Sequence, residues 1–287
     1  MLRTMFNRVA KYVRVGLRPV RWREYEAYLR QALDAGYQVV PLETWLAGPD
    51  GFSGKILVLR HDVDAYPQAA WPMSLIERRL GLTSTFYFRW CSLRPGLIKR
   101  IRENGSQVGF HYETLTRYAI EHHFHTPEMI TPEVMAACRA TLKEEIACFK
   151  GIVGGCASVA AHGDQRAHAV GRTNDDLLQG QSWADFGISY TADDPDALRK
   201  IDCWVSDGEG APTYWSSGVS FPEALAAGHR LVLFNTHPHH WGLGAAVVAE
   251  RLVAYLPQMT WSLNTLERGR PEALAWYRYR DLSGRTP

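Results

Sequence analysis

Ile56-Leu57-Val58-Leu59 runs directly into the polar stretch Arg60-His61-Asp62-Val63-Asp64. Four consecutive apolar residues, with Gly54 before them and Tyr66-Pro67 after them, indicate a strand that is buried on both faces. In α/β folds, ligands bind at the carboxyl ends of such strands. Two carboxylates there are unfavourable to bury unless a cation or hydrogen-bond donors offset their charge. The stretch therefore predicts a metal ligand and a catalytic base side by side at a strand end.

The composition is that of an ordinary globular protein. The chain has 287 residues, of which 46% are hydrophobic and 22% charged, and its net charge is +2. This charge gives no sign of nucleic-acid binding, so no nucleic-acid partner is expected. Five cysteines without CxxC spacing favour buried thiols in a reducing compartment over a disulfide framework or a zinc knuckle. Since the sequence shows neither an apolar run of ~20 residues nor a secretory signal, a cytoplasmic location is expected.

The first 23 residues are basic before any acidic residue appears. Seven Lys and Arg side chains precede Glu24, and several apolar residues among them could share one helix face. The pattern favours an ordinary basic arm packed on the domain. Weak contact with an anionic membrane surface, peripheral to the inner membrane, is the alternative. The sequence makes no prediction of oligomeric state.

Strand-like runs alternate with helical patterns along the chain. The spacing predicts helices over residues 23–35, 68–80, 95–104, 131–149 and 244–255. It predicts strands over residues 38–41, 55–60, 83–88, 107–110, 152–153, 159–161, 188–191 and 231–235. Strands separated by helices imply parallel βαβ units, in a barrel or in a doubly wound sheet. The prediction is one α/β domain over residues 51–287, with a basic, helical lead over residues 1–50 packed on it.

Three more strand ends repeat the polar pattern. The predicted strands are followed by His111-Tyr112-Glu113, by His162-Gly163-Asp164 and by Thr236-His237. One histidine after a strand is common in proteins, but four strand ends that each carry His or Asp are expected to meet at one rim of the sheet. Imidazole and carboxylate together suit a borderline divalent cation, with zinc as the first choice.

In their order, these motifs resemble those of the polysaccharide deacetylase family, the NodB-like group also called carbohydrate esterase family 4. The resemblance spans residues 55–255 and rests on Asp62-Val63-Asp64, Gly109-Phe110-His111 and the late stretch from Thr236 to Trp241. The His-Asp-Val-Asp, His-Tyr-Glu and His-Gly elements resemble a branch of deacetylases from surface-polysaccharide (O-antigen type) clusters. The resemblance implies a partly closed, distorted (β/α) barrel of about seven strands with an N-terminal helical extension.

The resemblance also implies roles for individual residues. Asp62 matches the catalytic base, Asp64 a metal ligand and His237 the general acid that protonates the departing amine. Trp241 would shape the acetyl pocket. The candidate substrate-binding residues are Trp241, Asp207, Glu113 and Arg60. Asp193-Asp194 is predicted to be a solvated helix cap.

The ligand set departs from the family pattern at one position. The family binds its metal with His-x-x-x-His, and His111 fits the first histidine while Leu115 occupies the second. His162 is the preferred third ligand, and Glu113 is the alternative. The family's Arg-x-Pro-Tyr motif is missing, and His162-Gly163 stands in its place.

The function implied is metal-dependent N-deacetylation of an acetamido sugar, a nucleotide-linked or lipid-linked intermediate of surface-polysaccharide synthesis. Zinc is the expected metal, with cobalt, nickel or manganese as alternatives. A related C–N hydrolase, such as a deformylase or an amidohydrolase, would use the same residues. A carbohydrate-binding domain that has lost its metal is the non-enzymatic alternative. Leu115 favours that alternative, whereas the presence of both Asp62 and His237 argues against it.

Overall fold

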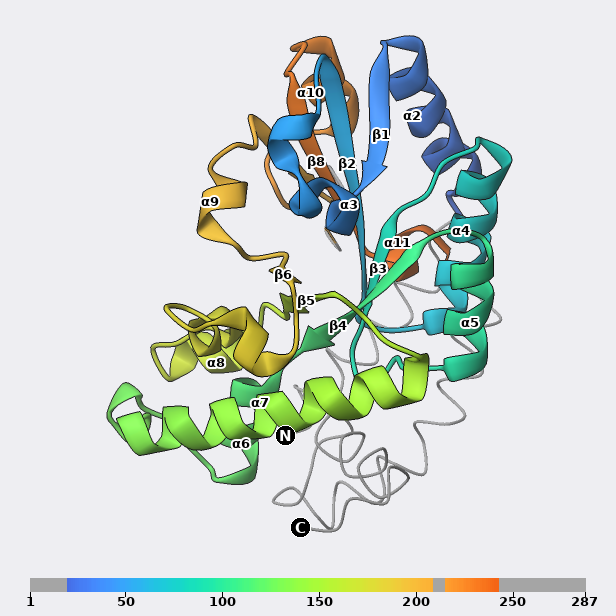
Figure 1. Ribbon diagram of the computed structural model, residues 1–287. Helices are drawn as coiled ribbons and strands as arrows, with labels where there is room; N and C mark the ends of the chain where they lie inside the picture. Colours follow the sequence, from blue (N-terminus) through green and yellow to red (C-terminus); the bar gives the residue numbers. More distant parts are fainter. Residues whose placement is uncertain (1–19, 209–214, 243–287) are drawn as a thin grey trace, which may run out of the picture.

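A curled sheet of parallel strands forms the centre of the fold (Figure 1). The structure is a computed structural model and describes residues 20–208 and 215–242. Along the sheet the strands follow the order β6 (Tyr190–Thr191), β5 (Ser158–Ala161), β4 (Gln107–Tyr112), β3 (Thr85–Phe88), β2 (Lys55–Val63), β8 (Leu231–Thr236) and β7 (Cys203–Ser206). All strand pairs in the described ranges are parallel. The predicted single α/β domain with a partly closed barrel is confirmed.

Strand β2 lies in the middle of this sheet. β8 pairs with one of its edges, from Ile56 to His61. On the other edge β1 (Tyr37–Pro41) pairs with the first half of β2 and β3 pairs with the second half. This central position explains why the apolar run of β2 is buried on both faces. The segment before residue 50 thus contributes a strand to the same sheet.

The connections between the strands contain both long and short helices. The α-helices are α2 (Trp22–Asp34), α3 (Leu42–Ala47), α4 (Ala70–Arg79), α5 (Pro95–Glu103), α6 (Thr114–Glu121), α7 (Pro132–Val153), α8 (Gln165–Ala169), α9 (Pro195–Leu198), α10 (Phe221–Ala226) and α11 (Pro238–Gly242). Short 3-10 helices lie at Pro49–Gly51, Pro67–Ala69, Pro127–Met129, Asn174–Leu177 and Trp183–Phe186. Helices α4 and α5 stand along one side of the sheet, and α7 crosses its lower end (Figure 1).

Helix α7 corrects one predicted strand. The helix begins where expected, because the hydroxyl of Thr131 accepts a hydrogen bond from the backbone N–H of Val134 and Pro132 follows at the first helical position. It ends only at Gly154, whose φ of 77° gives the left-handed cap. The predicted strand over residues 152–153 is therefore wrong, since both residues form the last turn of α7.

Strand β7 was not predicted from the sequence, and neither were the helices α3, α6, α8, α10 and α11. β7 is a short strand with Trp204 exposed, so its apolar alternation is weak. The predicted helix over residues 244–255 lies outside the described residues, as does most of the basic N-terminal segment. Within residues 20–208 and 215–242, none of the helices has the length and apolarity that a membrane span requires.

Side chains alternate between the two faces of β2, and this alternation positions the site. Ile56 and Val58 face the barrel interior, where they pack in one cluster with Tyr87 of β3. Leu57 and Leu59 face outward and pack in a cluster that includes residues of α2. Arg60 and Asp62 continue the interior face, because the Arg60 guanidinium lies over the Tyr87 ring. The interior face thus changes from apolar to charged along one strand.

His61 points to the outer face and is fully buried there. Its Nε2 lies 2.8 Å from a carboxylate oxygen of Glu77, and its Nδ1 lies 2.6 Å from the hydroxyl of Thr236. The hydroxyls of Tyr25 and Ser84 also donate to Glu77. These contacts satisfy the buried polar groups behind β2, so His61 belongs to the packing of the sheet and not to the cleft.

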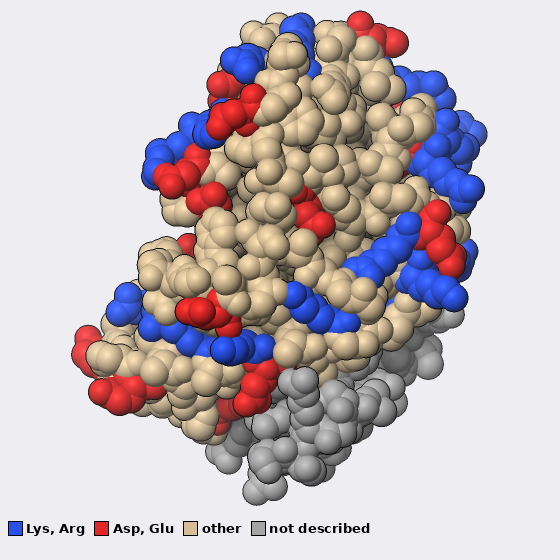
Figure 2. Space-filling view, viewed as in Figure 1, with Lys and Arg blue, Asp and Glu red and all other residues tan. Residues whose placement is uncertain are grey.

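Positively and negatively charged side chains both lie on the surface of the described residues. Figure 2 shows Lys and Arg side chains on this face with acidic side chains beside several of them. Two of the ion pairs are Arg79–Glu26 at 3.0 Å and Lys200–Asp50 at 2.8 Å. Such exposed pairs contribute little to stability.

Gly109 of β4 occupies a position where no side chain fits. A Cβ there would lie 2.3 Å from Cε1 of Tyr87 and 2.7 Å from the carbonyl oxygen of Ser158. Tyr87 is buried and donates a hydrogen bond to the Ser158 hydroxyl, so it cannot move aside freely. We expect Gly109→Ala to lower the free energy of unfolding by about 1–3 kcal/mol, measured by urea denaturation.

The control for this prediction is Gly151→Ala in α7. Nothing lies within 4 Å of a Cβ added at Gly151, which is exposed. The substitution should leave the unfolding midpoint unchanged or raise it slightly, because alanine favours a helix more than glycine does. Equal midpoints for the two variants would contradict the steric account of Gly109.

Candidate metal and catalytic site

The carboxyl ends of β2, β4, β5 and β8 surround a cleft of about 340 Å³. The predicted residues that line it are Asp62, Asp64, His111, His162, His237 and Arg60. They meet because each continues the interior face of its strand beyond the apolar part. Four segments far apart in the sequence thus place their His and Asp side chains in one cleft.

Three imidazoles surround the carboxylate of Asp64. Its Oδ1 lies 3.3 Å from Nε2 of His111, and its Oδ2 lies 3.6 Å from Nε2 of His162 and 3.6 Å from Nε2 of His237. Burial alone would raise the pKa of Asp64, but His162 and His111 hold it well below its usual range. The carboxylate is therefore ionised at neutral pH.

The donor atoms around Asp64 fit a divalent metal ion. Nδ1 of His111 lies 3.0 Å from the carbonyl oxygen of Ala160, so its N–H donates there and Nε2 is the ring nitrogen directed at Asp64. Within the part of the chain that the structure describes, Oδ1 of Asp64 is buried without a well-aligned hydrogen bond. Ligands of one tetrahedral ion, with bonds of about 2.0–2.2 Å, lie about 3.3–3.6 Å apart. The separations of Asp64 from His111 and from His162, one to each carboxylate oxygen, lie in that range.

Among the described residues, two groups have three ligand-type atoms that all lie within 4.8 Å of one another, and Asp64 belongs to neither. They are Glu113 with His162 and Asp164, and Asp207 with His237 and His240. The carboxylates of both groups already have strong partners. Arg89 pairs with Glu113, Arg166 pairs with Asp164, and His237 together with Trp241 binds Asp207. No Lys or Arg side chain in the described ranges pairs with the Asp64 carboxylate, which leaves Asp64 as the best anionic ligand.

Asp62 is held by two hydrogen bonds. Its Oδ1 accepts from Nε of Arg60 at 2.8 Å, and its Oδ2 accepts from the Asn235 side-chain amide at 3.0 Å. Burial alone would raise the pKa of Asp62, but Arg60 and then His111 lower it. The carboxylate is thus ionised and fixed in orientation, as a base that receives a proton in the cleft must be.

His237 forms a tight pair with Asp207. Its Nδ1 lies 2.6 Å from Oδ1 of Asp207, and its backbone N–H donates to the same carboxylate. Burial alone would lower the pKa of His237, but the Asp207 carboxylate outweighs this effect and raises it to about 10. The ring is therefore protonated at neutral pH with Nε2 facing the cleft, as a general acid requires.

The four candidate substrate-binding residues occupy different positions. Arg60 lines the cleft and pairs with Asp62. Asp207 is buried behind His237, and Trp241 is buried behind Asp207, to which its indole N–H donates at 2.6 Å. Glu113 is buried and pairs with Arg89. None of these last three is among the residues that line the cleft.

Asp193 is a cleft residue that sequence reasoning missed. Asp194 caps α9 as expected, by accepting from the backbone N–H of Asp196 at 3.0 Å. Asp193 instead accepts from the backbone N–H of Ala161 at 2.6 Å and lies 3.9 Å from Nη1 of Arg60. The prediction of a solvated cap is wrong for Asp193. Its position just after strand β6 was the available signal, since Asp62 and Asp64 follow the same pattern on β2.

Asn235 and Arg89 were also missed. Asn235 ends β8 on the interior face and orients Asp62, while Arg89 follows β3 and neutralises Glu113. Polar residues at strand ends could have indicated both. Asp62 lies on β2, which pairs with β8, and Glu113 directly follows β4, which pairs with β3, so both pairings depend on the sheet.

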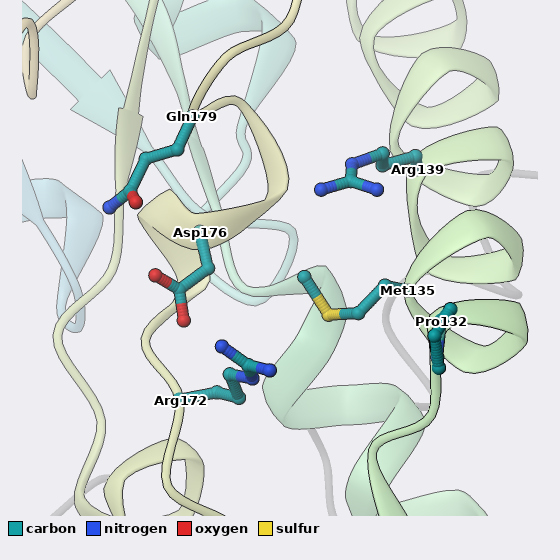
Figure 3. Close-up of a pocket in the computed structure, with 6 residues that line it drawn as sticks. All are labelled: Pro132, Met135, Arg139, Arg172, Asp176 and Gln179. Carbon is teal, nitrogen blue, oxygen red and sulfur yellow. The ribbon is translucent and has the colours of Figure 1, made fainter.

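A second cavity, of about 330 Å³, lies between α7 and the loop that follows α8 (Figure 3). Its lining residues are Pro132, Met135, Arg139, Arg172, Asp176 and Gln179. Arg139 donates from Nε to the carbonyl oxygen of Leu177 and so holds this loop, whose other residues line the cleft. With no histidine or cysteine, this cavity offers no alternative to the cleft as a metal site.

Comparison with known proteins shows a distant structural likeness. No protein-family model matches the chain, and no curated protein matches its sequence. Among solved structures, the Streptococcus pyogenes deacetylase PplD in complex with acetate is similar over 76% of this chain and 81% of its own length. The sequence identity is 15% and the TM-score is 0.41, so the likeness assigns neither a family nor an activity to this chain.

Proposed function

We propose that this protein is a metal-dependent hydrolase that removes the acetyl group from an acetamido sugar. The observation that carries the proposal is the Asp64 carboxylate with three imidazole nitrogens within 3.6 Å. An ionised carboxylate, Asp62, and a protonated imidazole, His237, lie in the same cleft. A ligand set, a base and an acid together are what amide hydrolysis requires.

The residues divide the chemistry among them. Asp64, His111 and His162 would hold the cation, which when bound supplies a Lewis acid for the amide carbonyl and lowers the pKa of water. Asp62 accepts the proton of the attacking water while Arg60 and Asn235 keep its carboxylate oriented. A C–O bond forms to the carbonyl carbon.

The departing group is an amine. His237 donates the proton from Nε2 to the sugar nitrogen as the C–N bond breaks, and Asp207 stabilises the imidazolium before transfer. The products are acetate and a free amino sugar. No electron donor or acceptor is needed, because hydrolysis leaves the oxidation states unchanged.

The cleft suits a carbohydrate. A volume of about 340 Å³ accommodates a small sugar, and Trp204 at its edge is 43% exposed, so its ring face is available for stacking. Nη1 of Arg60 and Oδ1 of Asn235 are buried without hydrogen-bond partners among the described residues and can bind substrate groups. A cytoplasmic nucleotide-linked or lipid-linked intermediate of surface-polysaccharide synthesis is the proposed substrate, and zinc is the proposed metal.

The test combines metal removal with an assay of acetate release. Protein treated with a chelator should lose at least about 99% of its activity on acetamido nucleotide sugars, and about one equivalent of zinc should restore it. Less than about a tenth of an equivalent of metal after zinc or cobalt supplementation would contradict the proposal. Release of formate instead of acetate would favour a deformylase. Sugar binding without hydrolysis would favour a non-catalytic domain.

The variant Asp207→Asn tests the role of His237 as the general acid. The variant lacks the carboxylate that raises the pKa of His237 to about 10, so that pKa should fall. We expect kcat to fall about 100-fold and the basic limb of the pH–rate profile to move to lower pH, with metal content unchanged. A basic limb at the wild-type position would show that Asp207 does not set the protonation of His237.

A further inference from the structure

His162 presents one ring nitrogen to Asp64 and buries the other without a partner. Nε2 lies 3.6 Å from Oδ2 of Asp64, whereas Nδ1 has no hydrogen bond within the described residues. A neutral imidazole that gives its Nε2 lone pair to a cation carries its hydrogen on Nδ1. A buried N–H without an acceptor is unfavourable, so a ligand in this position needs one.

His111 shows what such a partner does. Its Nδ1 donates to the carbonyl oxygen of Ala160 at 3.0 Å, which fixes the ring with Nε2 toward Asp64. The carbonyl comes from the neighbouring strand β5, which pairs with β4 at this point. His162 lies just beyond the end of β5, and the carboxylates near its Nδ1 belong to side chains.

Two carboxylates lie at the same distance from Nδ1 of His162. Oε2 of Glu113 and Oδ2 of Asp164 are each 3.9 Å away. Arg166 occupies both oxygens of Asp164, with its backbone N–H and Nε on Oδ1 and with Nη2 on Oδ2. Arg89 binds Oε2 of Glu113, the oxygen nearer to His162, while Oε1 is buried and has no hydrogen-bond partner among the described residues. The Glu113 carboxylate therefore has an oxygen without a donor, whereas both oxygens of Asp164 accept from Arg166.

The backbone around His162 is fixed, so a small rotation of the ring is the motion needed. The backbone N–H of His162 donates to the carbonyl oxygen of Tyr112 at 2.8 Å, and its carbonyl accepts from the Asn174 amide at 2.7 Å. A shift of about 1 Å brings Nδ1 within hydrogen-bond distance of Glu113. Arg89 holds Glu113 in place and also reaches the backbone carbonyl of Asp64 at 3.5 Å.

We infer that Glu113 is a positioning residue for the metal site. It accepts a hydrogen bond from Nδ1 of His162 and thereby directs Nε2 at the cation shared with Asp64 and His111. In this role Glu113 is not itself a ligand. Of the two candidates for the third metal ligand, His162 and Glu113, the inference therefore selects His162. The inference rests on the proposed function, because it requires that a metal binds at Asp64.

The experiment measures zinc affinity by competition with a chromophoric chelator, independently of activity. Glu113→Ala should weaken zinc binding about 10–100-fold, as loss of a partner to a ligating histidine does. Glu113→Gln keeps an acceptor oxygen and should weaken zinc binding only a few-fold. Asp164→Asn is the matched control at the same 3.9 Å distance and should bind zinc like the wild type.

Cobalt spectra distinguish a positioning residue from a ligand. The visible absorption of the cobalt-loaded Glu113→Gln variant should match that of the cobalt-loaded wild type, because the ligand atoms are unchanged. An altered spectrum of the cobalt-loaded variant, or loss of cobalt binding in Glu113→Gln, would make Glu113 a ligand and overturn the inference. If Glu113→Ala fails to fold because Arg89 is left buried and unpaired, Arg89→Met/Glu113→Met removes both charges and should show the same 10–100-fold loss.

The outcomes also separate this inference from the proposed function. Wild-type protein that binds no zinc overturns both. If the wild-type protein binds zinc and both Glu113→Ala and Asp164→Asn bind it with the same affinity, the inference about Glu113 is overturned but the proposed function is not.

Discussion

Asp64→Asn is expected to abolish metal binding and hydrolysis together. The substitution keeps the size of the side chain but removes the negative charge that three imidazole nitrogens face at 3.3–3.6 Å. The imidazoles that remain supply no negative charge to balance a divalent cation in a buried cleft. Bound zinc should fall from about one equivalent to below about a tenth, and kcat/KM should fall about 1,000-fold or more, measured by metal analysis and acetate release.

Asp175→Asn is the matched control for this loss. Asp175 lines the same cleft, but its carboxylate accepts from the Gln179 amide and forms no ion pair with a histidine in the described residues. The control should retain its zinc, so that a loss in Asp64→Asn is specific to position 64. Wild-type zinc content and activity in Asp64→Asn would show that the metal, if bound, lies elsewhere.

Asp62→Asn is expected to retain the metal and lose about 1,000-fold in kcat. The asparagine oxygen can still accept from Arg60, but an amide does not accept the proton of an attacking water. Asp193, 3.9 Å from Nη1 of Arg60, keeps a negative charge near the guanidinium, so the fold should tolerate the change. Single-turnover acetate release measures the chemical step, and metal analysis of the same sample measures occupancy.

The two aspartate variants are informative as a pair. Asp62→Asn with metal and Asp64→Asn without it would divide the roles into base and ligand. A loss of metal from Asp62→Asn equal to that from Asp64→Asn would instead make Asp62 a ligand. An unchanged kcat in Asp62→Asn would assign the proton transfer to another group.

Much of the site follows from local pattern. The apolar run of β2 is long enough to be recognised as a buried strand, and polar residues begin where that run ends. The same reasoning places His111, His162 and His237 at strand ends, and the cleft contains all three. Burial and alternation are properties of a few consecutive residues, so sequence alone can indicate them.

Contacts between residues on different segments were harder to predict from the sequence. Trp241 was expected at the acetyl pocket, yet its indole N–H donates to Asp207 behind His237. Asp207 was expected at the substrate, yet it binds His237. Such pairings join residues about 30 positions apart, and no local pattern specifies them.

By itself the sequence of this protein determined that β2, β4, β5 and β8 are strands and which side chains follow them, including the neighbours Asp62 and Asp64. Only the tertiary structure decided that His61 turns to the outer face against Glu77, and that Asp64 faces three imidazoles. The physical reason is that β2, β4, β5 and β8 come together through parallel register. Contacts of 3.3–3.6 Å depend on that register, and residues far apart in the chain set it together.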